Sequence, residues 1–133
     1  MTKRIIALTI LLLFCGEIAM AENAEIRSEG GFFIVKTQIE PSSPVVGTNV
    51  VTLTVLDGRS KTAIDGAKIE VVPWMTVHGH GSSKKTRIKE KGKGIYVVEN
   101  VYFTMTGEWD LLIKIQKDGI EDKVIVTFKN VKN

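Results

Sequence analysis

The ten residues from Pro73 to Ser82, PWMTVHGHGS, contain both histidines of the chain. His78 and His80 are separated only by Gly79, and Met75 precedes His78 by three positions. Imidazole nitrogen and thioether sulfur together suit copper, above all Cu(I), whereas a zinc site more often includes cysteine or a carboxylate. The loop is therefore a candidate copper site. The alternative is a hairpin tip whose histidines bind no metal.

Apolar residues alternate with polar ones throughout the chain after residue 31, as in Val51, Leu53 and Val55 and again in the series from Trp109 to Ile115. This period of two predicts half-buried strands, and no helix-length stretch has apolar residues at helical spacing. We expect an all-β fold, an immunoglobulin-like antiparallel β-sandwich of about seven strands. The expected strands are residues 32–40, 49–57, 67–75, 84–90, 95–103, 109–116 and 121–129.

Strand direction predicts where the second internal methionine lies. If successive strands reverse direction, the loop after the strand at 67–75 and the end of the strand at 95–103 occupy the same end of the sandwich. Met105 is then near Met75, His78 and His80. We predict these four side chains as the metal ligands; the alternative places both methionines in the core as packing residues.

The N-terminus has the features of a secretory signal peptide. Lys3 and Arg4 precede a short apolar run, and Ala19-Met20-Ala21 offers small residues for cleavage. The run is too short for a stable membrane span. We expect residues 1–21 to be the signal peptide, 22–31 a short N-terminal extension and 32–133 the sandwich domain, located in the periplasm or outside the cell. The alternative is a lipoprotein acylated on Cys15, the single cysteine.

Charge and motifs exclude several classes of function. The chain has 18 Lys and Arg against 15 Asp and Glu, so a strong electrostatic attraction to nucleic acid is not expected. The bases at odd positions from Lys85 to Lys93 lack interleaved aromatic residues, and we interpret them as the solvated face of a strand. No nucleophile elbow, phosphate-binding loop or dinucleotide-binding motif occurs. We expect no enzymatic activity and no catalytic residues.

Several segments resemble the YtkA-like family and, more distantly, the soluble domain of FixH-like proteins. They are VGTNVVTLTVLD, AIDGAKIEVVPWM, GKGIYVVENVYFTMTGEWDLLIKI and VIVTFKNV. The resemblance implies a small exported β-domain without enzymatic activity, linked with copper handling or the assembly of haem-copper oxidases. It also implies functional roles for Met75, His80 and Met105.

Two functions remain open at this point. The first is a copper-binding carrier or sensor, whose partner is a copper donor or acceptor protein or a membrane oxidase. The second is a metal-free module that binds another protein through an edge strand or through the loops at the end that contains the histidines.

Overall fold

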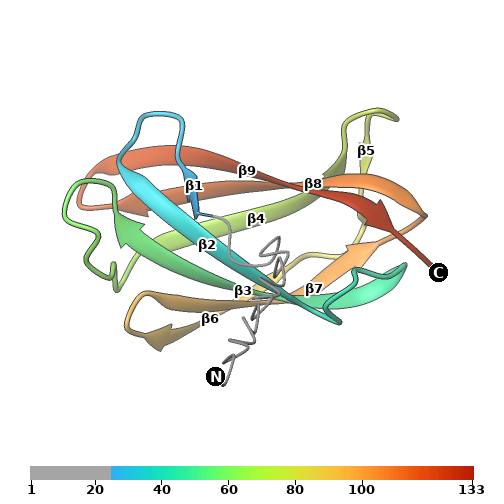
Figure 1. The fold of residues 1–133 in the computed structure, drawn as a ribbon, viewed down its shortest axis with the longest axis horizontal. Coiled ribbons are helices and arrows are strands. Elements are labelled where there is room, and N and C mark those ends of the chain that lie inside the picture. Colours follow the sequence, from blue (N-terminus) through green and yellow to red (C-terminus); the bar gives the residue numbers. More distant parts are fainter. Residues whose placement is uncertain (1–24) are drawn as a thin grey trace, which may run out of the picture.

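The computed structural model describes residues 25–133, which fold into two antiparallel β-sheets that pack face to face (Figure 1). The expected signal peptide and Cys15 lie outside this part of the chain. The nine strands are β1 (Glu25–Arg27), β2 (Phe33–Glu40), β3 (Gly47–Asp57), β4 (Lys68–Met75), β5 (His80–Gly81), β6 (Arg87–Gly92), β7 (Ile95–Phe103), β8 (Gly107–Lys117) and β9 (Ile120–Val131). The first sheet has the order β1-β2-β3-β7-β6 and the second the order β5-β4-β8-β9. The expected all-β sandwich is confirmed.

The core forms because each long strand directs its alternate apolar residues toward the opposite sheet. In β8, Trp109, Leu111, Ile113 and Ile115 are buried, while Leu112 between them is exposed on the outer face. Residues of β3 and β7, such as Leu53 and Val98, meet them from the first sheet. Because strand side chains alternate between faces, a one-residue shift in register would expose this entire set.

The structure adds two short strands to the seven that the sequence predicts. β5 lies within the histidine loop, and β1 lies within the segment expected to be an extension, residues 22–31. In the structure, β1 pairs with β2 in the register Glu25↔Lys36, so residues 25–27 form the outer strand of the first sheet. Ser28 and Gly30 then donate hydrogen bonds to the carboxylate of Asp122 in β9. The alternation in residues 25–27 is too short to be recognised without its partner strand.

The basic strand forms an edge of the first sheet. β6 begins at Arg87, three residues later than expected, and pairs only with β7 among the described strands. Arg87 and Lys89 are exposed and lie 3.9 and 3.0 Å from the carboxylate of Glu99 on β7. Ile88 turns inward between them. The interpretation as a solvated edge strand is therefore confirmed, and its lysines disfavour pairing with other chains.

Among residues 25–133, no helix is long and apolar enough to cross a membrane.

Candidate metal centre

The histidine loop is a hydrogen-bonded hairpin at the end of β4. The carbonyl oxygen of Met75 accepts hydrogen bonds from the main-chain N–H groups of His78 and Gly79, at 3.2 and 2.8 Å. The chain then returns as β5, which places His80 opposite Met75. Gly79 has a φ of +67°, a conformation that glycine adopts without a steric penalty. The glycine between the histidines therefore allows the turn that brings the second histidine back beside Met75.

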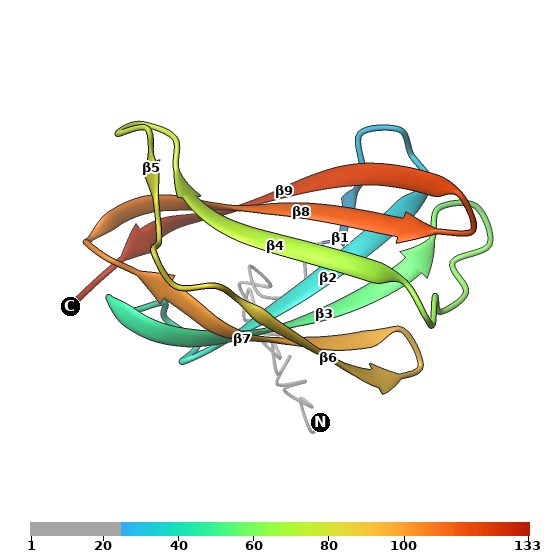
Figure 2. The ribbon, with the colours of Figure 1, turned by 180° about the vertical axis from the view of Figure 1, so that it is seen from behind.

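The turn between β7 and β8 lies at the same end of the sandwich as this hairpin (Figure 2). Met75, which is only 2% exposed, lies between the two segments. A Cβ atom added to Gly107 would lie only 2.9 Å from the terminal methyl group of Met75, Cε. Gly107 follows Met105 by two residues, so the turn that carries Met105 lies at the same end of the sandwich as Met75, as strand direction predicts.

Trp109 connects the two loops. Its ring centroid lies 5.9 Å from that of His80, with an angle of 77° between the ring planes, an edge-to-face arrangement. Its indole nitrogen Nε1 donates a hydrogen bond to the carbonyl oxygen of Met105, at 2.9 Å. Trp109 itself is completely buried and also packs against Phe103. One rigid indole thus positions the His80 ring and the main chain that carries Met105.

The four predicted ligands differ in their access to solvent. Met75 is buried at the base of the site and His80 is partly buried, whereas His78 is exposed and Met105 is 39% exposed. The ring of His78 stacks loosely on that of His80, at 5.9 Å between centroids and 25° between planes. The four side chains thus comprise a buried thioether, a half-buried imidazole, an exposed imidazole and an exposed thioether.

A further polar contact holds the hairpin against the second sheet. The Thr76 hydroxyl donates to the Asp110 carboxylate at 2.5 Å, and the Thr127 hydroxyl donates to the other oxygen of that carboxylate at 2.7 Å. Asp110 lies on β8 directly after Trp109. The residue after Met75 is thus tied to the strand that carries Trp109, which restricts movement of the loop.

Sequence reasoning missed the contribution of Trp109 and Gly107 to this site. The alternating series from Trp109 to Ile115 predicted an inward-facing Trp109, which is correct, but the contact of Trp109 with His80 was not predicted. The short spacing of Met105, Gly107 and Trp109 in the sequence was the signal that these residues lie close to one another. In the described part of the chain, no three His, Cys, Asp or Glu side chains gather as a metal-binding group. The candidate site consists instead of imidazoles and thioethers.

A family model described as YtkA-like matches residues 34–114 of the chain. The matched region runs from β2 through β8, and it includes the histidine hairpin, Met105 and Trp109. The chain belongs to the YtkA-like family. No curated protein sequence matches the chain significantly.

Solved structures share the fold of this YtkA-like domain at low sequence identity. A copper-bound variant of FetP from uropathogenic Escherichia coli is 9% identical, with a TM-score of 0.55, over 83% of this chain and 95% of that protein. A DUF4426 family protein from Pseudomonas aeruginosa is 12% identical, also with a TM-score of 0.55, over 77% of this chain and 94% of that protein. At such identities the similarity establishes the β-sandwich fold.

Proposed function

We propose that this YtkA-like domain is exported and binds copper, preferentially Cu(I), through Met75, His78, His80 and Met105. The observation that supports the proposal most strongly is the convergence of the two loops on Trp109. This indole contacts the ring of His80 and hydrogen-bonds the main chain of Met105. Met75 lies against the same turn, beside Gly107. The fold similarity of the domain to a copper-bound protein supports the choice of copper as the ion.

The ligand types favour the reduced ion. Two neutral thioether sulfurs are soft ligands that favour Cu(I), whereas imidazole serves both oxidation states. Methionine also forms no disulfides, so it can remain a ligand in an oxidising compartment. Because Met75 is buried, a bound ion would have one side shielded from water.

The exposed ligands fit a carrier that exchanges its metal with another protein. His78 and Met105 lie at the surface of one end of the domain. A donor or acceptor protein could replace these two ligands while Met75 and His80 still hold the ion. We propose copper handling, including delivery to a membrane oxidase, as the role of this transfer, and we propose no enzymatic activity.

The direct test is a competition titration of the purified protein with a chromogenic Cu(I) chelator. Met105→Leu keeps volume and apolarity, so the free energy of unfolding should fall by less than about 1.5 kcal/mol. Its Cu(I) affinity should fall by about tenfold or more, with little change in any Cu(II) affinity. His80→Ala should weaken the binding of both ions, and His78→Ala should have a smaller effect because His78 is more exposed than His80.

Lys89→Ala serves as the control, since this residue lies on β6 in the opposite sheet. Wild-type protein that retains no stoichiometric copper in either oxidation state would reject the proposal. Equal Cu(I) affinities of the wild type and Met105→Leu would remove Met105 from the site.

A further inference from the structure

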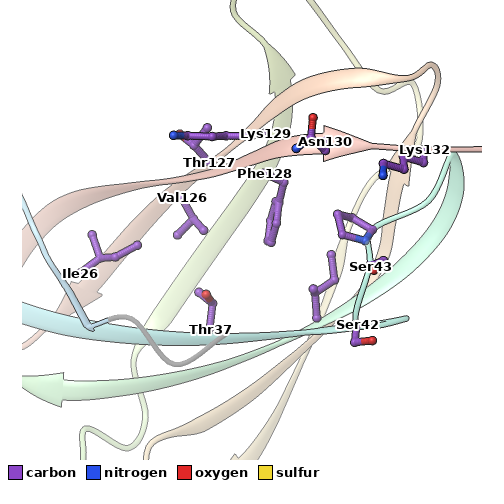
Figure 3. A pocket seen from close by; sticks show the side chains of 12 residues that line it. Ile26, Thr37, Ser42, Ser43, Val126, Thr127, Phe128, Lys129, Asn130 and Lys132 are labelled. Atoms are coloured by element: carbon purple, nitrogen blue, oxygen red, sulfur yellow. The ribbon is translucent and has the colours of Figure 1, made fainter. Parts of the chain in front are cut away.

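A groove runs between the two sheets on the side of the sandwich where β2 and β9 face each other (Figure 3). Its volume is about 630 Å³, and Val126 and Phe128 point into it from β9. Ile26 and Ile39 of the first sheet contribute further apolar surface. Among residues 25–133, the charged residues that line it are Lys129 and Lys132, without a carboxylate. Polar residues such as Thr37, Ser42 and Asn130 also line it, so the groove combines an apolar wall around Val126 and Phe128 with polar groups and two lysines.

β9 forms the upper wall of this groove, and it is an edge strand of the second sheet. Its two ends are tied to the rest of the domain. The main-chain N–H of Glu29 donates to the carbonyl oxygen of Lys123, at 2.9 Å, and Lys132 exchanges main-chain hydrogen bonds with Pro44 and Val46, at 3.1 and 2.8 Å. Within residues 25–133, no strand pairs with the edge of β9 between these two ties.

The pairing pattern shows which main-chain groups face this open edge. In an antiparallel ladder, the N–H and C=O of alternate residues point toward the same neighbouring strand. The carbonyl of Lys123 points away from β8, because it accepts from Glu29. The β8–β9 register is regular from Lys117↔Ile120 to Asp110↔Thr127. Ile125 and Thr127 therefore also direct their N–H and C=O groups away from β8, into the open edge.

We propose that β9 is a docking edge for an extended segment of a partner protein, which adds antiparallel to β9 as a fifth strand of the second sheet. The free N–H and C=O groups of Ile125 and Thr127 supply the main-chain hydrogen bonds, as in other cases of strand addition. A strand that pairs with Val124 to Asn130 spans about seven residues, roughly 23 Å. The proposal does not depend on copper binding.

The alternation of side chains in a strand specifies the chemistry of the partner. Every second residue of the added strand points into the groove, beside Val126 and Phe128, so apolar residues are favoured there. The residues between them lie on the outer face, next to Lys123 and Lys129. Both lysines are exposed, and neither forms an ion pair among the described residues. The partner segment therefore alternates apolar and acidic residues.

The same lysines argue against a second copy of the chain as the occupant. If two β9 strands paired antiparallel through Ile125 and Thr127, Lys123 of one copy would lie directly opposite Lys129 of the other. Like charges directly opposite each other destabilise a strand pair. Lysines at this edge thus disfavour self-association and at the same time attract an acidic segment.

The test uses the purified protein and a fluorescently labelled peptide of seven residues, Val-Glu-Val-Glu-Val-Glu-Val, in an anisotropy titration. In an antiparallel pair, directly opposite residues point their side chains to the same face, so the three glutamates lie opposite Ile125, Thr127 and Lys129. N-methylation of the three glutamate amides should weaken binding by about tenfold or more, since it removes the donors that face β9. N-methylation of three valine amides is the matched control and should change the affinity little.

Charge reversal tests the specificity. The double variant Lys123→Glu/Lys129→Glu should lose affinity for the glutamate peptide and gain affinity for Val-Lys-Val-Lys-Val-Lys-Val. Lys91→Glu, an exposed lysine on β6, is the control and should leave the preference of the wild type unchanged. Hydrogen exchange should also slow at the amides of Ile125 and Thr127 when the glutamate peptide binds.

Several outcomes would overturn the proposal. Equal affinities of the two N-methylated peptides would exclude main-chain pairing with β9, and the absence of measurable binding would exclude the docking edge altogether. A concentration-dependent dimer in sedimentation, with the Ile125 and Thr127 amides protected in the absence of peptide, would make a second copy the occupant. Binding that appears only after residues 1–24 are removed would assign the edge to the N-terminal segment of the chain itself.

Discussion

The indole N–H of Trp109 donates a hydrogen bond to the main-chain oxygen of Met105, at 2.9 Å. A single buried side chain thereby fixes the path of a surface turn that carries a candidate copper ligand. The same indole lies against the ring of His80, which comes from a loop almost 30 positions earlier in the chain. Properties of the candidate site should therefore respond to substitutions of core residues that have no metal-binding group.

Trp109→Phe should separate the hydrogen bond from the packing. Phenylalanine keeps a buried aromatic ring but loses the donor to Met105, so the free energy of unfolding should fall by about 1–3 kcal/mol. Cu(I) affinity should also fall, because the Met105 turn loses its anchor. Chelator competition and denaturant titration measure the two effects. Trp74→Phe is the control, because it makes the same substitution at a partly exposed tryptophan. An unchanged Cu(I) affinity in Trp109→Phe would mean that the turn keeps its position without the hydrogen bond.

Gly107→Ala should affect both stability and metal binding. Gly107 has a φ of +124°, and an added Cβ would lie 2.9 Å from the Met75 methyl group. The backbone strain should cost about 1–3 kcal/mol, and the Met75 thioether must move. Gly119→Ala is the matched control, because Gly119 also has a positive φ, +78°, but nothing lies within 4 Å of the added Cβ. Both variants should be less stable than the wild type, whereas only Gly107→Ala should show a lower Cu(I) affinity.

Burial of Trp109 also predicts a large contribution to global stability. Trp109→Ala removes a side chain that is 0% exposed, and the free energy of unfolding should fall by about 3–5 kcal/mol. Lys89→Ala removes an exposed side chain on the edge strand β6, and its effect should stay within about 0.5 kcal/mol. Midpoints of urea denaturation provide the comparison. Similar midpoints for the two variants would contradict the burial of Trp109.

Asp122 should make the stability of the fold depend on pH. Burial by itself raises the pKa of its carboxyl group, but hydrogen bonds from the Ser28 hydroxyl and from the main-chain N–H groups of Gly30, Lys123 and Phe32 outweigh burial and lower the pKa. A carboxyl group whose pKa is lower in the folded state stabilises the fold at pH values above its ordinary value of 3.8. This contribution is lost as the pH falls through the pKa of the folded state.

Asp122→Asn should therefore be less stable than the wild type by about 1–3 kcal/mol at neutral pH. The difference should shrink below pH 3.8. Asp57→Asn is the comparison, because the exposed Asp57 carboxylate accepts main-chain hydrogen bonds from its near neighbours Arg59 and Ser60. These hydrogen bonds also lower the pKa of Asp57, so its variant should show a change of the same sign but smaller. Urea denaturation of both variants at several pH values between 7 and 2.5 gives the measurement. A stability difference for Asp122→Asn that does not change with pH would show that its ionised form does not hold residues 28–32 in place.

The sequence predicted the long strands because each of them carries its own signal. Alternation in β8, from Trp109 to Ile115, is a property of consecutive residues, and it identifies the inward face without knowledge of the partner strand. The histidine pair with its glycine and the nearby methionine are likewise local. Even the placement of the turn that carries Met105 at the same end as the histidine hairpin followed from counting strand reversals. For these features, local pattern and chain direction were sufficient.

Only the tertiary structure revealed the features that depend on partners distant in sequence. β1 has just three residues, and it exists because β2 offers an edge with which it can pair. The contact between Trp109 and His80 depends on the packing of β5 and β4 beside β8, and the open edge of β9 depends on the order of strands in the sheet. A sequence specifies which residues alternate along each strand. The packing of all strands together decides which strand edges pair. The physical reason is that main-chain hydrogen bonding is the same for every strand, so only the assembled sheets determine which edges remain unpaired.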